Sequence, residues 1–272
     1  MDIIEAHGAR IPVLGFGTMT LKEDQCVDLV EAALQLGYRH LDTAQMYGNE
    51  REVGSGLRGS GLKRDEVFLT TKVWFNRLAP GDFERSVDES LAKLGLPWVD
   101  LLMIHWPNTQ IPLAGSIAAL CKVKKQGLAK HIGVANFNIA MIEAATALAG
   151  EPIAVLQIET HPYLDQTKVV AAARRHGMAV VGYCPLARGK VPGDTTLQQI
   201  GRAHGKTAAQ VALRCLEQER IIPIPRTSKR ERLAENLGSL DFTLSDAEMA
   251  EIGKLKRPDG RIVSPPQAPV WD

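Results

Sequence analysis

The sequence of 272 residues predicts an α/β fold, a (β/α)8 TIM barrel that forms one domain over residues 1–272. Two observations lead to this prediction. Short apolar runs alternate with amphipathic helical segments, which is typical of parallel strands buried on both faces. Seven runs are clear and an eighth is weaker, and eight such units in a chain of about 250 residues favour a closed barrel over an open doubly wound sheet. No linker rich in Pro, Gly or Ser divides the chain.

The expected strands and helices follow in chain order. The weak run at residues 14–17 precedes the seven clear ones, at 38–41, 67–71, 99–104, 130–134, 153–158, 178–183 and 220–224. Four helical segments have apolar residues at three- and four-residue spacing and end at a glycine: Asp24 to Gly37, Asp82 to Gly95, Ser116 to Gly127, and Asp165 to Gly177. We expect each first Asp or Ser to accept from free backbone N–H groups, and each glycine to adopt a left-handed cap.

The last residues, 257–272, form a tail that cannot be a regular helix because it contains Pro258, Pro265, Pro266 and Pro269. The tail ends in Trp271 and Asp272. Two placements stay open: against the outer wall of the barrel, or over the barrel mouth, where the tail would help to shape a substrate pocket. The fold expected here has the tail over the mouth.

Composition and charge exclude several classes of protein. The chain has 32 Lys and Arg against 31 Asp and Glu, so it lacks the broad basic field of a nucleic-acid-binding protein. The four cysteines, Cys26, Cys121, Cys184 and Cys215, form no CxxC pair and no cluster with His, so we expect neither disulfides nor a metal site. The sequence shows no signal peptide and no apolar run of about 20 residues. We therefore expect a cytoplasmic monomer that acts on a small molecule, without a nucleic-acid or membrane partner.

Polar residues follow the expected strands at their C-terminal ends, where barrels of this kind have their active sites. They are Asp42 with Tyr47 just beyond, Lys72, His105, Asn136, Gln157 with Glu159, Tyr183, and Arg226. Each of them alone is usually a cap, a surface charge or a structural residue, but together they point to one site.

A Tyr, a Lys, an Asp and a His together suggest acid catalysis at a carbonyl group. A phenol with a pKa of about 10 is a poor acid at neutral pH, and a nearby ammonium would lower that pKa. Asp42 would keep Lys72 charged and oriented, and His105 would donate to the carbonyl oxygen. Such a site needs a hydride donor, because the sequence has no Ser or Cys nucleophile beside a base.

Three motifs resemble the signatures of the aldo-keto reductase family. They are the stretch GYRHLDTAQMYGNE at 37–50, residues 94–107 from Leu94-Gly95-Leu96 to His105-Trp106-Pro107, and Ile224-Pro225-Arg226-Thr227 with Arg232, Glu235 and Asn236. Lys72 stands where the family has its catalytic lysine. The resemblance covers essentially the whole chain. Within the family it is strongest to the small bacterial reductases of 2,5-diketo-gluconate and methylglyoxal.

This resemblance implies a barrel whose lower end is closed by an N-terminal hairpin over residues 3–14, and NADPH bound across the mouth without a Rossmann domain. It implies that Tyr47 is the general acid, that Asp42 and Lys72 tune it, and that His105 orients the carbonyl. The implied activity is NADPH-dependent reduction of small aldehydes and ketones, such as methylglyoxal and diketo sugar acids.

The resemblance also implies positions for the cofactor and the substrate. The nicotinamide carboxamide of NADPH would be held by Asn136 and Gln157, and the nicotinamide ring would stack on Tyr183. The pyrophosphate would follow Pro185, Leu186, Ala187 and Gly189. The adenosine 2′-phosphate would be held by Arg226, Thr227 and Arg232, with Glu235 and Asn236 near the adenine. The substrate pocket is assigned to Trp74, Trp106 and the tail with Trp271.

Three residues depart from the usual family pattern. Ala135 stands where Ser is common, so one hydrogen bond to the carboxamide is missing or replaced by water. Arg226 stands where the family commonly has Lys, which keeps the positive charge and adds a planar guanidinium that can form two hydrogen bonds to a phosphate. Cys184 stands where Ser is frequent, as a small packing residue or as a thiol that makes activity sensitive to oxidants.

Other interpretations have less support. The stretch Gly54-Ser55-Gly56-Leu57-Arg58-Gly59 satisfies GxGxxG, but a polar, helix-like segment precedes it instead of the strand that a dinucleotide site needs. A Schiff-base aldolase using Lys72 is a second possibility, although Asp42 argues for a charged lysine. A non-catalytic nucleotide sensor is a third, and the complete Asp, Tyr, Lys and His set argues against it.

Overall fold

The computed structural model describes residues 2–272, and its core is a sheet of eight parallel strands. The strands are β3 (Phe16–Gly17), β4 (His40–Asp42), β5 (Phe68–Val73), β6 (Val99–Ile104), β7 (Ala129–Ala135), β8 (Ile153–Glu159), β9 (Ala179–Tyr183) and β10 (Ile221–Pro223). Each strand pairs with the next one along the chain. Gly15 N donates to Pro223 O at 3.0 Å and Gly17 N to Pro225 O at 3.1 Å, so the first and last strands meet.

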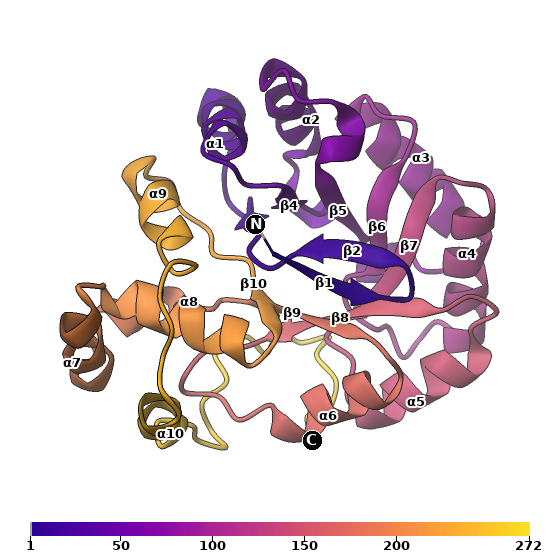
Figure 1. Ribbon diagram of the computed structural model, residues 1–272. Coiled ribbons are helices and arrows are strands. Elements are labelled where there is room, and N and C mark those ends of the chain that lie inside the picture. The colour runs from indigo at the N-terminus through magenta and orange to yellow at the C-terminus, as the bar shows by residue number, and fades with distance from the viewer. Residues whose placement is uncertain (1) are drawn as a thin grey trace.

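Helices surround the sheet on its outer side (Figure 1). They are α1 (Glu23–Gln35), α2 (Glu50–Gly59), α3 (Asp82–Leu94), α4 (Leu113–Lys125), α5 (Ile139–Leu148), α6 (Thr167–Arg175), α7 (Thr195–His204), α8 (Ala208–Gln218), α9 (Glu231–Leu237) and α10 (Asp246–Gly253). This is the α/β barrel that the sequence predicts. Within residues 2–272, apolar side chains between strands and helices form the largest of three buried apolar clusters.

The N-terminal hairpin predicted at residues 3–14 is present as β1 (Ile3–Ala6) and β2 (Ala9–Pro12), which pair antiparallel. Ile4 and Ile11 are buried against Leu101 and Met103, inside the barrel. The hairpin therefore covers one end of the inner core. Figure 1 shows it across the front of the barrel, whereas part of the yellow C-terminal segment passes behind the strands.

The expected helix ends are confirmed, but the expected helix starts are only partly right. Gly95 ends α3 with a φ of 66°, a left-handed cap. Asp165 lies one residue before the N-cap Gln166, and its carboxylate accepts from Thr167 N, the first backbone N–H of α6, at 3.0 Å. Ser116 is not a cap, because α4 begins at Leu113 and the Ser116 hydroxyl donates instead to Leu78 O at 3.0 Å. Asp24 and Asp82 lie inside the first turns of their helices and do not cap them.

The GxGxxG stretch lies inside helix α2, and a turn at Gln45–Tyr47 precedes that helix, so the stretch lacks the strand-to-helix loop of a Rossmann site. Its glycines allow neighbouring helices to approach closely. A Cβ on Gly54 would lie 2.0 Å from Leu94 O in α3, and a Cβ on Gly56 would lie 2.8 Å from Val27 O in α1. Both are closer than atoms can approach, so any side chain here would push the helices apart.

We expect the barrel to lose stability as the pH falls below 6.5, because of the buried His40. Burial lowers the pKa of His40 from 6.5 to about 4. Between these values the unfolded chain binds the proton and the folded chain does not, so acidification favours unfolding. At about 1.4 kcal/mol per pKa unit, the contribution is roughly 3 kcal/mol.

Urea unfolding at pH 7 and pH 5 measures about 2 kcal/mol of this contribution, because pH 5 lies about 1.5 units below the unfolded-state pKa of 6.5. The fall in unfolding free energy between the two values should be smaller in His40→Gln than in the wild type. An identical fall in both proteins would show that His40 is not the group responsible.

Candidate active site

The carboxyl ends of the strands open into a cavity of about 590 Å³. It brings together most of the residues that the sequence singled out: Asp42, Tyr47, Trp74, His105, Trp106, Asn136, Gln157, Tyr183, Pro185, Leu186, Gly189, Arg226 and Arg232. Met19, Met46 and Arg188 also line it, although no pattern in the sequence marks them as site residues. Residues spread over more than 180 positions of the chain therefore share one cavity, as expected for the carboxyl end of a parallel barrel.

Lys72 lies beneath the cavity as a buried cation. Its Nζ donates to Asp42 Oδ1 at 2.6 Å and to Thr43 O at 3.0 Å, and it lies 3.4 Å from the Tyr47 hydroxyl. Lys72 and Asp42 are 0% and 1% exposed. The other Asp42 oxygen, Oδ2, accepts from Gln157 Nε2 at 2.8 Å. Both carboxylate oxygens are thus occupied, and Asp42 holds Lys72 under the phenol as the sequence predicted.

The electrostatics of Tyr47 differ from the sequence prediction. Burial raises the pKa of Tyr47 well above 10, and the negative charge of Asp42 acts in the same direction. The net lowering of the Tyr47 pKa that we expected from the Lys72 ammonium does not appear, because burial and Asp42 outweigh the attraction of Lys72. Burial also lowers the pKa of Lys72, against the attraction of Asp42. Tyr47 is therefore a protonated phenol across the neutral pH range.

His105 is held as a neutral imidazole beside Tyr47. Burial and the Lys72 charge lower the pKa of His105 well below 6.5. Its ring packs edge-on against Tyr47 and Trp74, with centroids 5.6 Å and 5.1 Å away. A neutral imidazole has one N–H donor. His105 can therefore donate one hydrogen bond to a carbonyl oxygen without adding a charge to the site.

Asn136 links His105 to Tyr183 across the cavity floor. Asn136 Nδ2 donates to His105 O at 2.9 Å, and its Oδ1 accepts from the Tyr183 hydroxyl at 2.7 Å. Asn136 has a φ of 62°, the left-handed region that Asn tolerates better than most residues. The amides of Asn136 and Gln157 each use one N–H donor in these contacts, so each has a second donor for a ligand.

Two exposed arginines, Arg226 and Arg232, stand at the far end of the cavity. Arg226 Nε donates to Met19 O at 3.0 Å, and within residues 2–272 neither arginine forms an ion pair. Arg232 also lines a neighbouring cavity of about 420 Å³, together with Glu235 and Asn236. Helix α9 begins only at Glu231, so Arg226 lies in the preceding loop and not at a helix N-terminus.

Two predicted cofactor residues do not line either cavity. Ala187 is 0% exposed and packs in a core formed with α7 and α8. The Thr227 hydroxyl accepts from Lys229 N at 3.0 Å and so shapes its own turn. Both residues contribute to the form of their loops.

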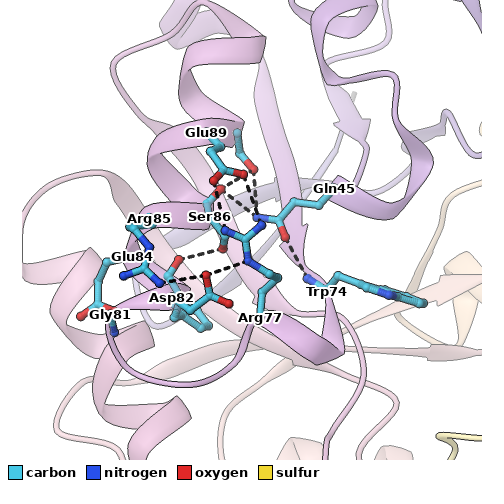
Figure 2. Close-up of polar contacts among 11 residues, drawn as sticks. Gln45, Trp74, Arg77, Gly81, Asp82, Glu84, Arg85, Ser86 and Glu89 are labelled. Carbon is cyan, nitrogen blue, oxygen red and sulfur yellow. Dashed lines mark hydrogen bonds and ion pairs between the residues drawn. The ribbon is translucent and has the colours of Figure 1, made fainter.

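Gln45 is a residue of this site that the sequence reasoning missed. It lies two positions before Tyr47, and Figure 2 shows its amide between Trp74 and Ser86. Gln45 Oε1 accepts from Trp74 N at 3.0 Å, and its Nε2 donates to Ser86 O at 2.9 Å. The amide thus ties the turn that carries Tyr47 to the loop after β5 and to α3. No recurring spacing marks such a residue in the sequence.

The tail contributes to the cavity, but not through its tryptophan. Val263, Pro265 and Gln267 line the cavity. Trp271, which was predicted to line it, packs edge-on against Trp106 with centroids 6.1 Å apart, and Arg261 lies 3.6 Å above its ring. Trp271 therefore supports the wall that Trp106 forms.

Cys184 lines the cavity beside Tyr183, but its environment does not favour oxidation. Burial and the Glu159 charge raise the pKa of the Cys184 thiol. The reactive form of cysteine is the thiolate, so a raised pKa makes the side chain less reactive. This favours the packing role over the oxidant-sensitive one.

Over residues 2–272, no group of three or more His, Cys, Asp or Glu side chains is arranged to hold a metal ion. Within the same range no helix has the length and apolar character needed to cross a membrane.

Comparison with known proteins gives consistent matches over nearly the whole chain. The sequence is 42% identical over 266 residues to the methylglyoxal reductase DkgB of Escherichia coli O157:H7, covering 96% of this chain and 99% of the relative. It is 36% identical over 285 residues to the aldo-keto reductase family 1 member A1 of Xenopus tropicalis, covering 92% and 87%.

Solved structures agree with these sequence matches. A crystal structure provisionally assigned as a 2,5-diketo-D-gluconic acid reductase B has a TM-score of 0.98 at 49% identity, covering 100% of this chain and 98% of the other. An aldo-keto reductase of Bombyx mori in complex with NADP has a TM-score of 0.90 at 31% identity, covering 97% and 95%. The profile of the aldo/keto reductase family matches residues 13–257, and the chain is an enzyme that belongs to this family.

Proposed function

We propose that this protein reduces small aldehydes and ketones to alcohols with NADPH, using Tyr47 as the general acid. The observation that carries the proposal is the buried chain of contacts from Asp42 to Lys72 to the Tyr47 hydroxyl, at the floor of a cavity. A relative at 42% identity is named a methylglyoxal reductase, which supports small dicarbonyl compounds as substrates.

The donor groups of the cavity fit a nicotinamide dinucleotide phosphate. Near Tyr47, the spare amide donors of Asn136 and Gln157 suit a carboxamide, and the half-exposed ring of Tyr183 suits stacking. At the far end, Arg226 and Arg232 are cations without an ion-pair partner in residues 2–272 and suit a phosphate. Bound in this way, the cofactor supplies the hydride for the carbonyl carbon.

The side chains at the floor of the cavity orient the carbonyl group, donate the proton and stabilise the charge that remains. His105 donates a hydrogen bond to the carbonyl oxygen and fixes its direction of approach. The Tyr47 hydroxyl gives its proton to that oxygen as negative charge develops there. An alkoxide is a much stronger base than a phenolate, so this transfer is favourable although burial raises the pKa of Tyr47. Lys72, 3.4 Å away, stabilises the phenolate that is left.

The cavity walls favour small, weakly polar carbonyl compounds. Trp74 and Trp106 form apolar walls near Tyr47, and the tail adds Val263 and Pro265. We propose that the tail lies over the mouth and takes part in substrate choice. We also propose a cytoplasmic monomer, since all four cysteines are free thiols.

Loss of NADPH absorbance tests the proposal directly. The purified protein is mixed with methylglyoxal, a diketo sugar acid, an aromatic aldehyde or a simple ketone, each at a range of concentrations. We expect saturable NADPH consumption with at least one of these compounds and formation of the matching alcohol. NADPH binding without turnover on any of them would support the nucleotide-sensor interpretation instead.

Replacing Arg226 by Ala should weaken NADPH binding by roughly ten- to a hundred-fold, because a charge-assisted hydrogen bond to phosphate is lost. NADH lacks this phosphate, so its affinity should change little. Fluorescence titration of both cofactors measures the two effects. Lys229→Ala is the matched control, since Lys229 is an exposed cation of the same loop that lines neither cavity. Equal losses for NADPH and NADH would show that Arg226 shapes the loop and does not recognise the phosphate.

A further inference from the structure

Glu159 is a fully buried carboxylate for which neither the sequence nor the mechanism above provides a role. It is the last residue of β8, two positions after Gln157, and it is 0% exposed. A buried carboxylate is costly unless its oxygens are paired. The partners of this side chain therefore indicate what it does.

Those partners lie mainly in the tail. Glu159 Oε1 accepts from Ile262 N at 2.7 Å, and Oε2 accepts from Val263 N at 2.8 Å. His161 Nε2 lies 2.9 Å from Oε1 on the same carboxylate. We call the Glu159 carboxylate with the backbone N–H groups of Ile262 and Val263 the tail anchor. It joins the carboxyl end of a barrel strand to a segment about 100 positions later in the chain.

The anchored segment has no regular secondary structure to fix its path. Residues 261–272 contain no helix and no strand, so they make no ladder of backbone hydrogen bonds. A second attachment lies at their far end, where Ile139 N donates to Asp272 Oδ2 at 2.8 Å and Asn138 Nδ2 donates to Val270 O at 3.0 Å. Val263, one of the two residues held by Glu159, and Pro265, two positions later, line the active-site cavity.

We propose that Glu159 is a positioning residue that sets the choice of carbonyl substrate by holding the tail wall of the cavity in place. The proposal rests on the reductase function proposed above. Glu159 does not line the cavity, so it acts through Val263 and Pro265 and not by touching the substrate. Its two oxygens accept from two successive backbone N–H groups, a geometry that needs an acceptor at both positions.

Glutamine is therefore an informative replacement. Glu159→Gln keeps the size of the side chain but presents an NH₂ donor to one of the two tail N–H groups, which breaks that hydrogen bond and leaves two donors facing each other. Glu217→Gln is the matched control, because Glu217 is a buried carboxylate on α8 that accepts from the Ser239 hydroxyl and does not touch the tail.

Amide hydrogen exchange tests whether the tail anchor protects the backbone N–H groups of Ile262 and Val263, and this measurement does not depend on enzyme activity. In full-length Glu159→Gln, exchange at Ile262, at Val263 or at both should be at least about tenfold faster than in the wild type. In the same protein, KM for the preferred carbonyl compound should change at least about threefold and the ranking of the substrate panel should change. The NADPH dissociation constant should stay within about twofold, and Glu217→Gln should show none of these effects.

A second pair of variants changes the tail side of the same contact, in case Glu159→Gln does not fold. Ile262→Pro removes one donor N–H and leaves the carboxylate intact, whereas Ile262→Ala trims the side chain but keeps that N–H. Ile262→Pro should reproduce the faster exchange at Val263 and the altered substrate ranking, and Ile262→Ala should not.

Two results would overturn the proposal. Unchanged exchange at Ile262 and Val263 in Glu159→Gln would show that the carboxylate does not hold the tail. Faster exchange with an unchanged substrate ranking would show that the tail anchor has no part in substrate choice. A wild type that reduces no carbonyl compound would instead refute the proposed function, and the exchange measurement would still decide whether the tail anchor exists.

Discussion

Replacing Tyr47 by Phe should lower kcat at least about 100-fold, because it removes the proton donor and keeps the ring. NADPH affinity should hardly change, since the Tyr47 hydroxyl contacts Lys72 at 3.4 Å and forms no contact with Arg226 or Arg232, the cations that suit the phosphate. The loss should appear in kcat more than in KM, because the hydroxyl acts only as charge develops on the carbonyl oxygen.

Steady-state kinetics with the best substrate of the panel measures this effect. Tyr163→Phe is the matched control, because the Tyr163 hydroxyl donates to Asp194 at 3.1 Å and lies outside the cavity. A Tyr47→Phe enzyme that keeps more than half of the wild-type turnover would show that another group supplies the proton.

Replacing Lys72 by Met should lower kcat at least about 1,000-fold, since the phenolate formed during proton transfer loses its neighbouring cation. It should also destabilise the fold by about 3–5 kcal/mol, because the buried Asp42 carboxylate is left without its partner. Thermal unfolding and turnover measure the two losses separately.

The double variant Lys72→Met with Asp42→Asn separates stability from catalysis. It removes both charges, and the Asn oxygen can still accept from Gln157, so much of the lost stability should return. Turnover should stay as low as in the single variant. Recovery of turnover together with stability would mean that Lys72 serves only the fold.

The positions of the candidate catalytic residues could be predicted because the strands of a parallel barrel all end at the same mouth. Each strand is a short apolar run, and the residue that ends it faces the same mouth. Asp42, Lys72 and His105 follow three such runs, so their meeting follows from sequence order alone. Tyr47 lies only five residues beyond Asp42, and a single turn, Gln45–Tyr47, brings it back to the cavity.

Other features depend on contacts that leave no local pattern. The α5 sequence, IAMIEAATAL, is apolar on nearly every side, so its residue spacing does not reveal a helix. Gln45, Glu159 and Trp271 act through partners that are distant in the sequence. The pKa of Tyr47 rises because burial and Asp42 outweigh the attraction of Lys72, a balance that depends on distances and not on residue types.

Transfer of deuterium from NADPH, labelled at the transferable position of its nicotinamide ring, tests the central claim most directly. The wild-type protein is mixed with labelled NADPH and its best carbonyl substrate, and the alcohol is examined by mass spectrometry and NMR. We predict one deuterium on the carbinol carbon for each NADPH oxidised. Unlabelled product, with the substrate trapped on Lys72 by borohydride in the absence of cofactor, would contradict the reductase mechanism and point to Schiff-base chemistry.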